Sequence, residues 1–297
     1  MKVTVLLGAF CMAWLLAGCG EPEIGMPATP TPSENAGEGT PEATSTPEAT
    51  PTPSESPTPT MTPTPTGTPT PTPTPLPEGE TAWDYSDIDV SWIDPSKPMV
   101  ALTIDDGPAA SSSQSILDTL EKYGAHCTFF WVGDRTQTYK EAAERAISLG
   151  CEVGNHSYGH EYLNKLSESE ISYQINEGVK ALNELTGWNK QAYIFRCPGG
   201  NVTDYVKSIV NAPIIYWSVD TRDWESRDCD KIVAKLVGQC QDGDIILCHE
   251  IYGATADALA IAIPKLQAEG FQIVSVSEMF KAKGIVMLNG HQYSSSR

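Results

Sequence analysis

A proline- and threonine-rich segment limits where this chain can fold. From Gly20 to Glu80 the sequence repeats Pro-Thr pairs and contains no aromatic residue, Lys or Arg. Such a segment buries too little apolar surface to offset the loss of chain entropy, so we expect residues 19–80 to form a disordered, extended tether. Residues 81–297 remain for a folded domain, and this length is sufficient for one sizeable core.

The first nineteen residues predict export and a lipid anchor. Lys2 precedes an apolar run, Val3 to Leu16, that is shorter than the ~20 residues needed to span a bilayer. The run leads into Leu-Ala-Gly-Cys, which resembles the bacterial lipobox, so we predict a lipoprotein signal peptide over residues 1–18 and a lipidated Cys19. An ordinary secretory signal is the alternative. The expected location is extracytoplasmic, on the outer face of the cell membrane or, in a Gram-negative cell, on the outer membrane.

The predicted domain is acidic. The whole chain has a formal charge of −19, and residues 81–297 contain 29 acidic and 18 basic residues. A surface of this charge repels nucleic acid and anionic membrane faces, so we expect no nucleic-acid partner and no membrane contact other than the lipid anchor. We also expect a monomer.

The spacing of the cysteines excludes one local disulfide. Cys229 and Cys240 enclose a single predicted helix, which would hold them about 16 Å apart, whereas a disulfide bridges at most ~7 Å. We therefore predict no bond between these two residues. The absence of a Cys-x-x-Cys pair argues against a cysteine-rich zinc site. Pairing is left open for the other four domain cysteines, which are Cys127, Cys151, Cys197 and Cys248.

Short apolar runs alternate with amphipathic stretches throughout residues 81–297. One amphipathic stretch begins at the capping box Ser167-Glu168-Ser169-Glu170 and stops at Gly187, as a helix would. This alternation predicts an α/β fold around a parallel sheet, open or closed into a barrel, with functional residues at the carboxyl ends of the strands. The predicted strands are Met99–Ile104, Cys127–Val132, Glu152–Asn155, Ala192–Arg196, Ile214–Val219, Asp244–Cys248 and Phe271–Val274.

Two pairs of polar residues at predicted strand ends suit a metal site. Asp105 and Asp106 follow the first strand, and adjacent strand residues point in opposite directions, so one can bind a cation while the other handles a proton. His156 and His160 are four residues apart and would lie on one face of a helical turn. Together with Asp106 they form a set that suits Zn²⁺, with Fe²⁺, Co²⁺ or Mn²⁺ as competitors. Alone, each pair would also fit solvated surface residues.

Three further motifs follow later predicted strands. They are Phe195-Arg196-Cys197-Pro198-Gly199-Gly200, Asp220-Thr221-Arg222-Asp223-Trp224 and Leu247-Cys248-His249. Together with Thr-Ile-Asp-Asp-Gly and His-Ser-x-x-His, they resemble, in the same order, the five motifs of the NodB-homology polysaccharide deacetylases, carbohydrate esterase family 4. The resemblance extends over nearly all of residues 97–283. It implies a distorted (β/α) barrel and a catalytic domain over residues 81–297.

The resemblance also implies a ligand set. Asp106, His156 and His160 would hold one divalent metal ion, zinc in the first place, with cobalt, manganese, nickel or iron as alternatives. A bound ion of this kind lowers the pKa of its water and polarises a carbonyl.

The same resemblance implies an acid and a base. Asp105 would be the general base, with the Arg196 guanidinium orienting its carboxylate and favouring the charged form. His249 would be the general acid, and Asp220 would hold it and favour its imidazolium form.

One position departs from the family pattern. Many members have an aromatic residue after the Pro of the arginine motif, where this chain has Gly199. Glycine keeps the backbone N–H implied in the oxyanion hole, but one side-chain wall of the groove would be lost. Trp224 is expected to form another wall, against the acetyl group or a sugar face.

The predicted activity is removal of acetyl groups from a β-linked N-acetylated glycan, with peptidoglycan, or a chitin-like oligosaccharide, as the expected substrate. O-deacetylation of xylan would use the same residues and is the enzymatic alternative. A sugar-binding lipoprotein without activity would not require the base Asp105, its partner Arg196 and the acid His249. An iron oxygenase shares the two-His, one-carboxylate ligand set but would depend on dioxygen.

Overall fold

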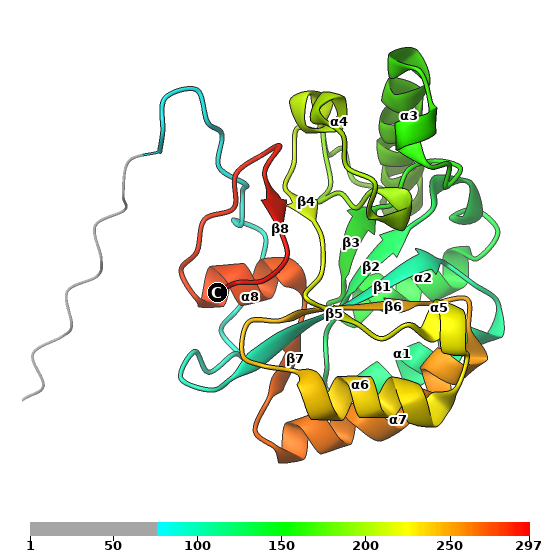
Figure 1. The fold of residues 1–297 in the computed structure, drawn as a ribbon, viewed down its shortest axis with the longest axis vertical. Helices are drawn as coiled ribbons and strands as arrows, with labels where there is room; N and C mark the ends of the chain where they lie inside the picture. Colours follow the sequence, from blue (N-terminus) through cyan, green and yellow to red (C-terminus); the bar gives the residue numbers. More distant parts are fainter. Residues whose placement is uncertain (1–75) are drawn as a thin grey trace, which may run out of the picture. The chain divides into compact units, whose positions relative to one another are not determined.

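The computed structural model describes residues 76–297 (Figure 1). The predicted signal peptide, Cys19 and nearly all of the predicted tether lie outside this range. Among the helices within it, none has the length and apolar character needed to cross a membrane.

A parallel sheet forms the centre of the domain, in the order β3-β2-β1-β6-β5 (Figure 1). β1 pairs with β6 along one edge. Along its other edge, the first residues of β1 pair with β7 and its last residues pair with β2. The strands are β1 (Met99–Gly107), β2 (Thr128–Trp131), β3 (Glu152–Asn155), β4 (Ile214–Ile215), β5 (Val219–Asp220), β6 (Ile245–His249), β7 (Gln272–Val274) and β8 (Gln292–Tyr293).

Isolated bridges carry the sheet onward from β3. Asn155 pairs with Phe195, and Phe195 pairs with Ile214, which belongs to the small β4-β8 sheet. The sheet therefore curves as a distorted α/β barrel, and the predicted fold class is confirmed.

Two of the predicted strands differ from the structure. Residues 192–196 form only an isolated bridge, at Phe195. The next hydrogen bond of the parallel ladder would have to run from the backbone N–H of residue 213 to the Tyr193 carbonyl, and Pro213 has no N–H. The predicted strand 214–219 is divided into β4 and β5, since residues 216–218 carry the chain from one part of the sheet to the other.

Helices cover the sheet (Figure 1). α3 starts at the predicted capping box, in which Ser167 and Glu170 exchange hydrogen bonds, and ends at Gly187 with a φ of 70°. α6 confirms the helix predicted after residue 228. The helices are α1 (Ser111–Tyr123), α2 (Lys140–Ser148), α3 (Glu168–Thr186), α4 (Asp204–Ile209), α5 (Asp223–Ser226), α6 (Cys229–Gln239), α7 (Gly253–Ala268) and α8 (Val276–Ala282).

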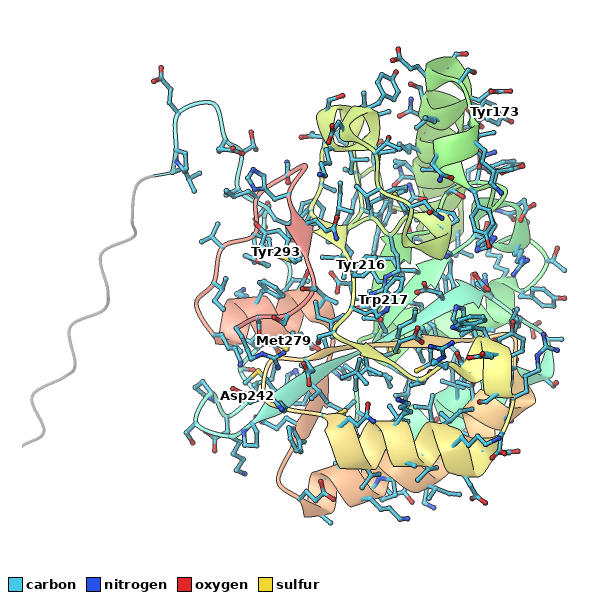
Figure 2. The ribbon with its side chains drawn as sticks, in the orientation of Figure 1. Tyr173, Tyr216, Trp217, Asp242, Met279 and Tyr293 are labelled. Atoms are coloured by element: carbon cyan, nitrogen blue, oxygen red, sulfur yellow. The ribbon has the colours of Figure 1, made fainter. Side chains whose placement is uncertain are left out.

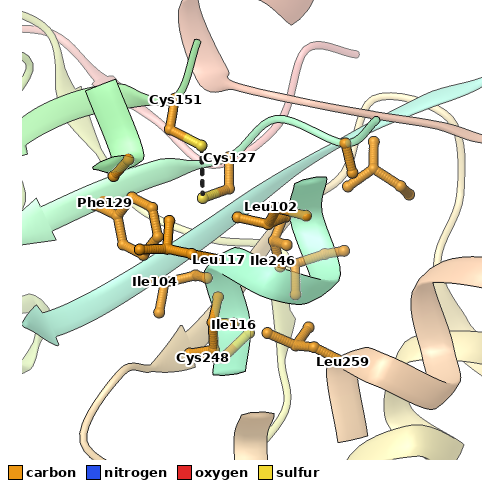
Figure 3. Packing of buried hydrophobic residues seen from close by; sticks show 14 of the residues in the cluster. Leu102, Ile104, Ile116, Leu117, Cys127, Phe129, Cys151, Ile246, Cys248 and Leu259 are labelled. Atoms are coloured by element: carbon orange, nitrogen blue, oxygen red, sulfur yellow. Dashed lines mark hydrogen bonds between the residues drawn. The ribbon is translucent and has the colours of Figure 1, made fainter. Parts of the chain in front are cut away.

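The main core lies between the sheet and the α1 and α7 side (Figure 3). Leu102 of β1 packs there with Leu117 and Leu259, and every residue of β1 is buried. Cys127 and Cys151, which precede β2 and β3, bring their Sγ atoms to 3.8 Å and are free thiols. A strand so fully enclosed holds the residues at its carboxyl end in fixed positions.

Candidate active site

The two adjacent aspartates lie inside the carboxyl end of β1, which runs three residues further than predicted. Asp105 is in register with His249 of β6. Asp106 has a φ of 71°, which a regular strand residue does not adopt, and both carboxylates line the same cavity. The expected opposite orientation is therefore wrong, because the chain has already turned at Asp106.

The histidine pair lies in a loop and not on the predicted helical turn. Ser157 and His160 both have positive φ, at 67° and 63°, and the His160 N–H donates to the Ser157 hydroxyl at 3.0 Å. The prediction of a helical turn after β3 is wrong, since the i, i+4 spacing does not reveal two left-handed residues. The two imidazoles still converge, with ring centroids 5.0 Å apart.

Three donor atoms meet as a metal site requires. Oδ1 of Asp106 lies 3.4 Å from His156 Nε2 and 2.9 Å from His160 Nε2, yet it is a buried atom that makes no hydrogen bond within the described residues. Burial alone would raise the pKa of Asp106, but the two imidazoles outweigh it and hold the pKa well below its usual range. His156 donates from Nδ1 to the Arg196 carbonyl at 2.8 Å, so its Nε2 lone pair faces the site. These residues fit one divalent cation.

A fully buried arginine holds the other carboxylate. Arg196 donates from Nη1 to Asp105 Oδ1 at 2.7 Å, and its side chain is 0% exposed. The guanidinium also donates to the carbonyls of Ile215 and Tyr216, and it lies 4.2 Å from the Phe130 ring centroid. The hydrogen bond from Arg196 therefore fixes Oδ1 of Asp105. The other carboxylate oxygen, Oδ2, faces the cavity near His156.

His249 is held by Asp223 and not by the predicted Asp220. Asp223 accepts a hydrogen bond from His249 Nδ1 at 2.7 Å and another from the His249 N–H at 2.6 Å. Burial alone would lower the pKa of His249, but the Asp223 carboxylate outweighs it and raises the pKa to about 9. Asp220 instead accepts from the Arg222 N–H at 2.8 Å and lines the cavity. The assignment to Asp220 is wrong because α5 begins at Asp223 and places that fully buried side chain beneath His249.

The metal-site residues, Asp105, Asp220 and His249 line one cavity of about 400 Å³, whereas Arg196 and Asp223 contact Asp105 and His249 without forming part of its lining. Trp224 lies at its edge and is 44% exposed, as expected for a groove wall and not for a core residue. Trp217, in the connection from β4 to β5 (Figure 2), also lines the cavity and adds a second wall. Tyr162 and Tyr252 also line the cavity, and no sequence motif had marked these three residues.

Comparison with known proteins identifies the family. Residues 93–213 match the family described as polysaccharide deacetylase. A Bacillus cereus peptidoglycan-N-acetylglucosamine deacetylase is 32% identical over 203 residues, which are 65% of this chain and 94% of that protein. This chain belongs to the polysaccharide deacetylase family.

Two further relatives of this chain have solved structures. Bacillus subtilis peptidoglycan-N-acetylmuramic acid deacetylase PdaC is 39% identical over 64% of this chain, and its solved structure superposes with a TM-score of 0.62 over 94% of that structure. An acetyl xylan esterase from Clostridium thermocellum, solved with a cobalt ion, superposes with a TM-score of 0.62 at 28% identity over 66% of this chain and 98% of that one. The chain spans about 40% of the length of the first curated relatives it matches.

The structure corrects the expectation for the position that departs from the family. Gly199 has a φ of 62°, and a Cβ built on it would lie 2.6 Å from Cε1 of Tyr162. The ring of Tyr162 thus occupies the space beside Gly199, so the groove of this deacetylase family member has an aromatic wall there. That wall comes from the loop after His160 and not from the arginine motif.

Proposed function

We propose that this chain is a metal-dependent deacetylase that hydrolyses the acetamido groups of an N-acetylated glycan. The main support is that the carboxylate of Asp105 and the imidazole of His249 line the same cavity as the three candidate metal ligands, Asp106, His156 and His160. Such a pair provides a general base and a general acid on either side of a scissile amide.

Each group of residues has a separate role in the proposed hydrolysis. A divalent ion held by Asp106, His156 and His160 would lower the pKa of its water and polarise the acetyl carbonyl. Asp105 takes the proton from the attacking water on Oδ2, the oxygen that Arg196 does not hold. Gly199 lines the cavity with its N–H available for the carbonyl oxygen as negative charge develops.

His249 completes the reaction by protonating the leaving nitrogen. Its Nδ1 is engaged with Asp223, so Nε2 is the nitrogen available to donate. With a pKa of about 9, the imidazole carries this proton at neutral pH. An amine is a poor leaving group unless protonated, so this step is essential for an amide.

Peptidoglycan is the substrate we propose. The Bacillus subtilis and Bacillus cereus relatives are named as peptidoglycan deacetylases, and a predicted lipid anchor and tether would hold the domain beside the cell wall. Zinc is the proposed ion.

Acetylated xylan is the second candidate substrate. It is supported by similarity to the Clostridium thermocellum esterase and to a bifunctional xylanase/deacetylase from Pseudobutyrivibrio xylanivorans. A sugar-binding protein without activity is less favoured, since binding alone requires neither the base nor the acid, and both are in place.

The test is incubation of the purified protein with peptidoglycan fragments, chitooligosaccharides and acetylxylan, followed by mass spectrometry. Each acetyl group removed lowers the product mass by about 42 Da. Loss from the amide substrates would support the proposal. Loss from acetylxylan alone would replace it with the esterase alternative, and loss from none would leave only the binding function.

A further inference from the structure

A second cavity, of about 570 Å³, lies at the opposite end of the sheet from the active site. Its lining includes His126 and Glu152, which stand where β2 and β3 begin, whereas His156 follows the end of β3. Four residues of extended chain separate Glu152 from His156 by roughly 13 Å. The volume lies within the range of about 300–1,000 Å³ that is usual for small-ligand sites.

Aromatic rings dominate the walls of this second cavity. Trp92 and Trp188 are 40% and 38% exposed, and both line it together with Trp83 and the mostly buried Tyr193. Trp188 is stacked against Tyr193 with ring centroids 6.2 Å apart. Trp92 donates from Nε1 to Glu278 at 3.2 Å. Two partly exposed indoles held in place before a ligand arrives form a ready stacking surface.

The lining of this cavity is acidic and favours a cationic ligand. Five carboxylates line the cavity, against a single lysine and the imidazole of His126. The lysine, Lys190, lies over the Trp188 ring, with Nζ 4.6 Å from the centroid, so a ligand ammonium group can take this ring face only by displacing the Lys190 side chain. Asp87 makes no hydrogen bond or ion pair within residues 76–297. The five carboxylates are those of Asp84, Asp87, Asp89, Glu152 and Glu278, and all of them except Asp87 already accept hydrogen bonds from other residues of the domain.

We propose that this cavity binds a glycan strand carrying free amino groups, the product expected from the active site. A β-linked pyranose presents a face of C–H bonds that packs on an indole, and its protonated 2-amino group matches the carboxylates and ring faces. An acetamido group carries no charge and lacks the second attraction. The domain would then remain beside the strand that it has modified. This inference rests on the proposed deacetylase function for the identity of its ligand.

The test is a binding measurement on detergent-solubilised full-length protein carrying Asp105→Asn, which prevents turnover of acetylated probes. Calorimetry compares a β-1,4-linked glucosamine tetramer with its fully N-acetylated counterpart. The glucosamine tetramer should bind at least about 10-fold more tightly, and added salt should weaken it because the attraction is partly between charges. Trp188→Ala and Asp87→Asn should each weaken it by about 3- to 30-fold.

Matched controls separate this cavity from the rest of the surface. Tyr173→Ala removes another exposed ring, on α3 (Figure 2), and Asp257→Asn removes another exposed acid, on α7; neither residue lines the second cavity, so neither change should alter binding. Equal affinity for the two tetramers, or loss of glucosamine binding on Trp224→Ala at the active site, would overturn the inference. Stronger binding of a lysine-containing peptide than of the amino glycan would also overturn the proposed ligand.

The two proposals fail separately. Binding is measured in a variant without the base, so it does not depend on turnover. Absence of acetyl release by the wild-type protein would refute the proposed function while leaving the binding result interpretable. In the converse case, a wild-type protein that deacetylates a short soluble oligosaccharide but shows no preference for the glucosamine tetramer refutes only this inference.

Discussion

Replacing Asp223 with Asn should move the pH dependence of catalysis. The Asp223 carboxylate raises the pKa of His249 to about 9 from an ordinary value of 6.5, which corresponds to about 3 kcal/mol in favour of the imidazolium. Without that charge, burial lowers the pKa of His249 and only the more distant Asp105 and Asp106 carboxylates still raise it, so the pKa should fall well below 9. At pH 7.5 the protonated fraction of His249 should fall from nearly complete to a minor fraction, so amide turnover should fall on the order of 10-fold.

The assay is kcat against pH for an N-acetylated oligosaccharide and for an aryl acetate, whose leaving group needs little protonation. The wild-type amide rate should decline as His249 deprotonates, with a limit at about 9 or somewhat lower when a nearby cation is bound. Asp223→Asn should shift this limit toward 6.5 and affect the aryl acetate less. Asp220→Asn is the matched control, because it removes a carboxylate of the same cavity that does not contact His249.

The same shift has a consequence for stability. Because the folded-state pKa of His249 is raised, its contribution to the free energy of unfolding is fully present below pH 6.5 and is lost as pH rises through about 9. In metal-free protein, chemical unfolding should show this loss in the wild type and not in Asp223→Asn. A pH limit that moves in Asp220→Asn and stays in Asp223→Asn would refute the reasoning and restore the assignment made from the sequence.

Three further predictions concern the ligands, the groove and the anchor. Asp106→Ala should lose metal and activity together, whereas Asp105→Asn should keep the metal and lose turnover by about 10²- to 10⁴-fold, as plasma mass spectrometry and initial rates would show; equal metal loss in both contradicts the roles. Gly199→Tyr should lower activity because of its φ of 62° and the Tyr162 ring, and adding Tyr162→Ala should restore part of it; no recovery in kcat/KM would contradict the steric account. Cys19→Ser should release the protein from membranes without changing the rate on a soluble substrate, and a variant that still sediments with membranes counts against lipidation.

The sequence predicted the fold class and the convergence of the ligands for a physical reason. Alternating buried strands and helices require a parallel sheet, and a parallel sheet brings the carboxyl ends of its strands to one edge. Asp105, Asp106, His156 and His249 follow or end such strands, so their proximity could be expected without coordinates. The second cavity lies outside every motif and had no comparable signal.

The errors share a different cause, which is local backbone conformation. Asp106 and His160 both have positive φ, and neither is a glycine, so sequence gave no sign of these turns. Asp223 and Asp220 are the same residue type three positions apart, and only the start of a short helix decides which of them is buried against the catalytic imidazole. The position of Tyr162 likewise depends on the loop that follows the histidine pair.

The separate roles of the adjacent carboxylates follow from what surrounds each one. Asp105 lies in β1 just before the backbone turns, where Arg196, buried and bonded to backbone carbonyls, holds one of its oxygens with a permanent charge. Asp106 has turned away from that cation toward two imidazoles. Glu250 supports the turn, since its carboxylate fills the space that a side chain at Gly107 would need. If Asp106 were the base and Asp105 the metal ligand, the buried Arg196 guanidinium would have to break its hydrogen bonds to backbone carbonyls. The packing beneath the site therefore fixes which aspartate is the base and which is the ligand.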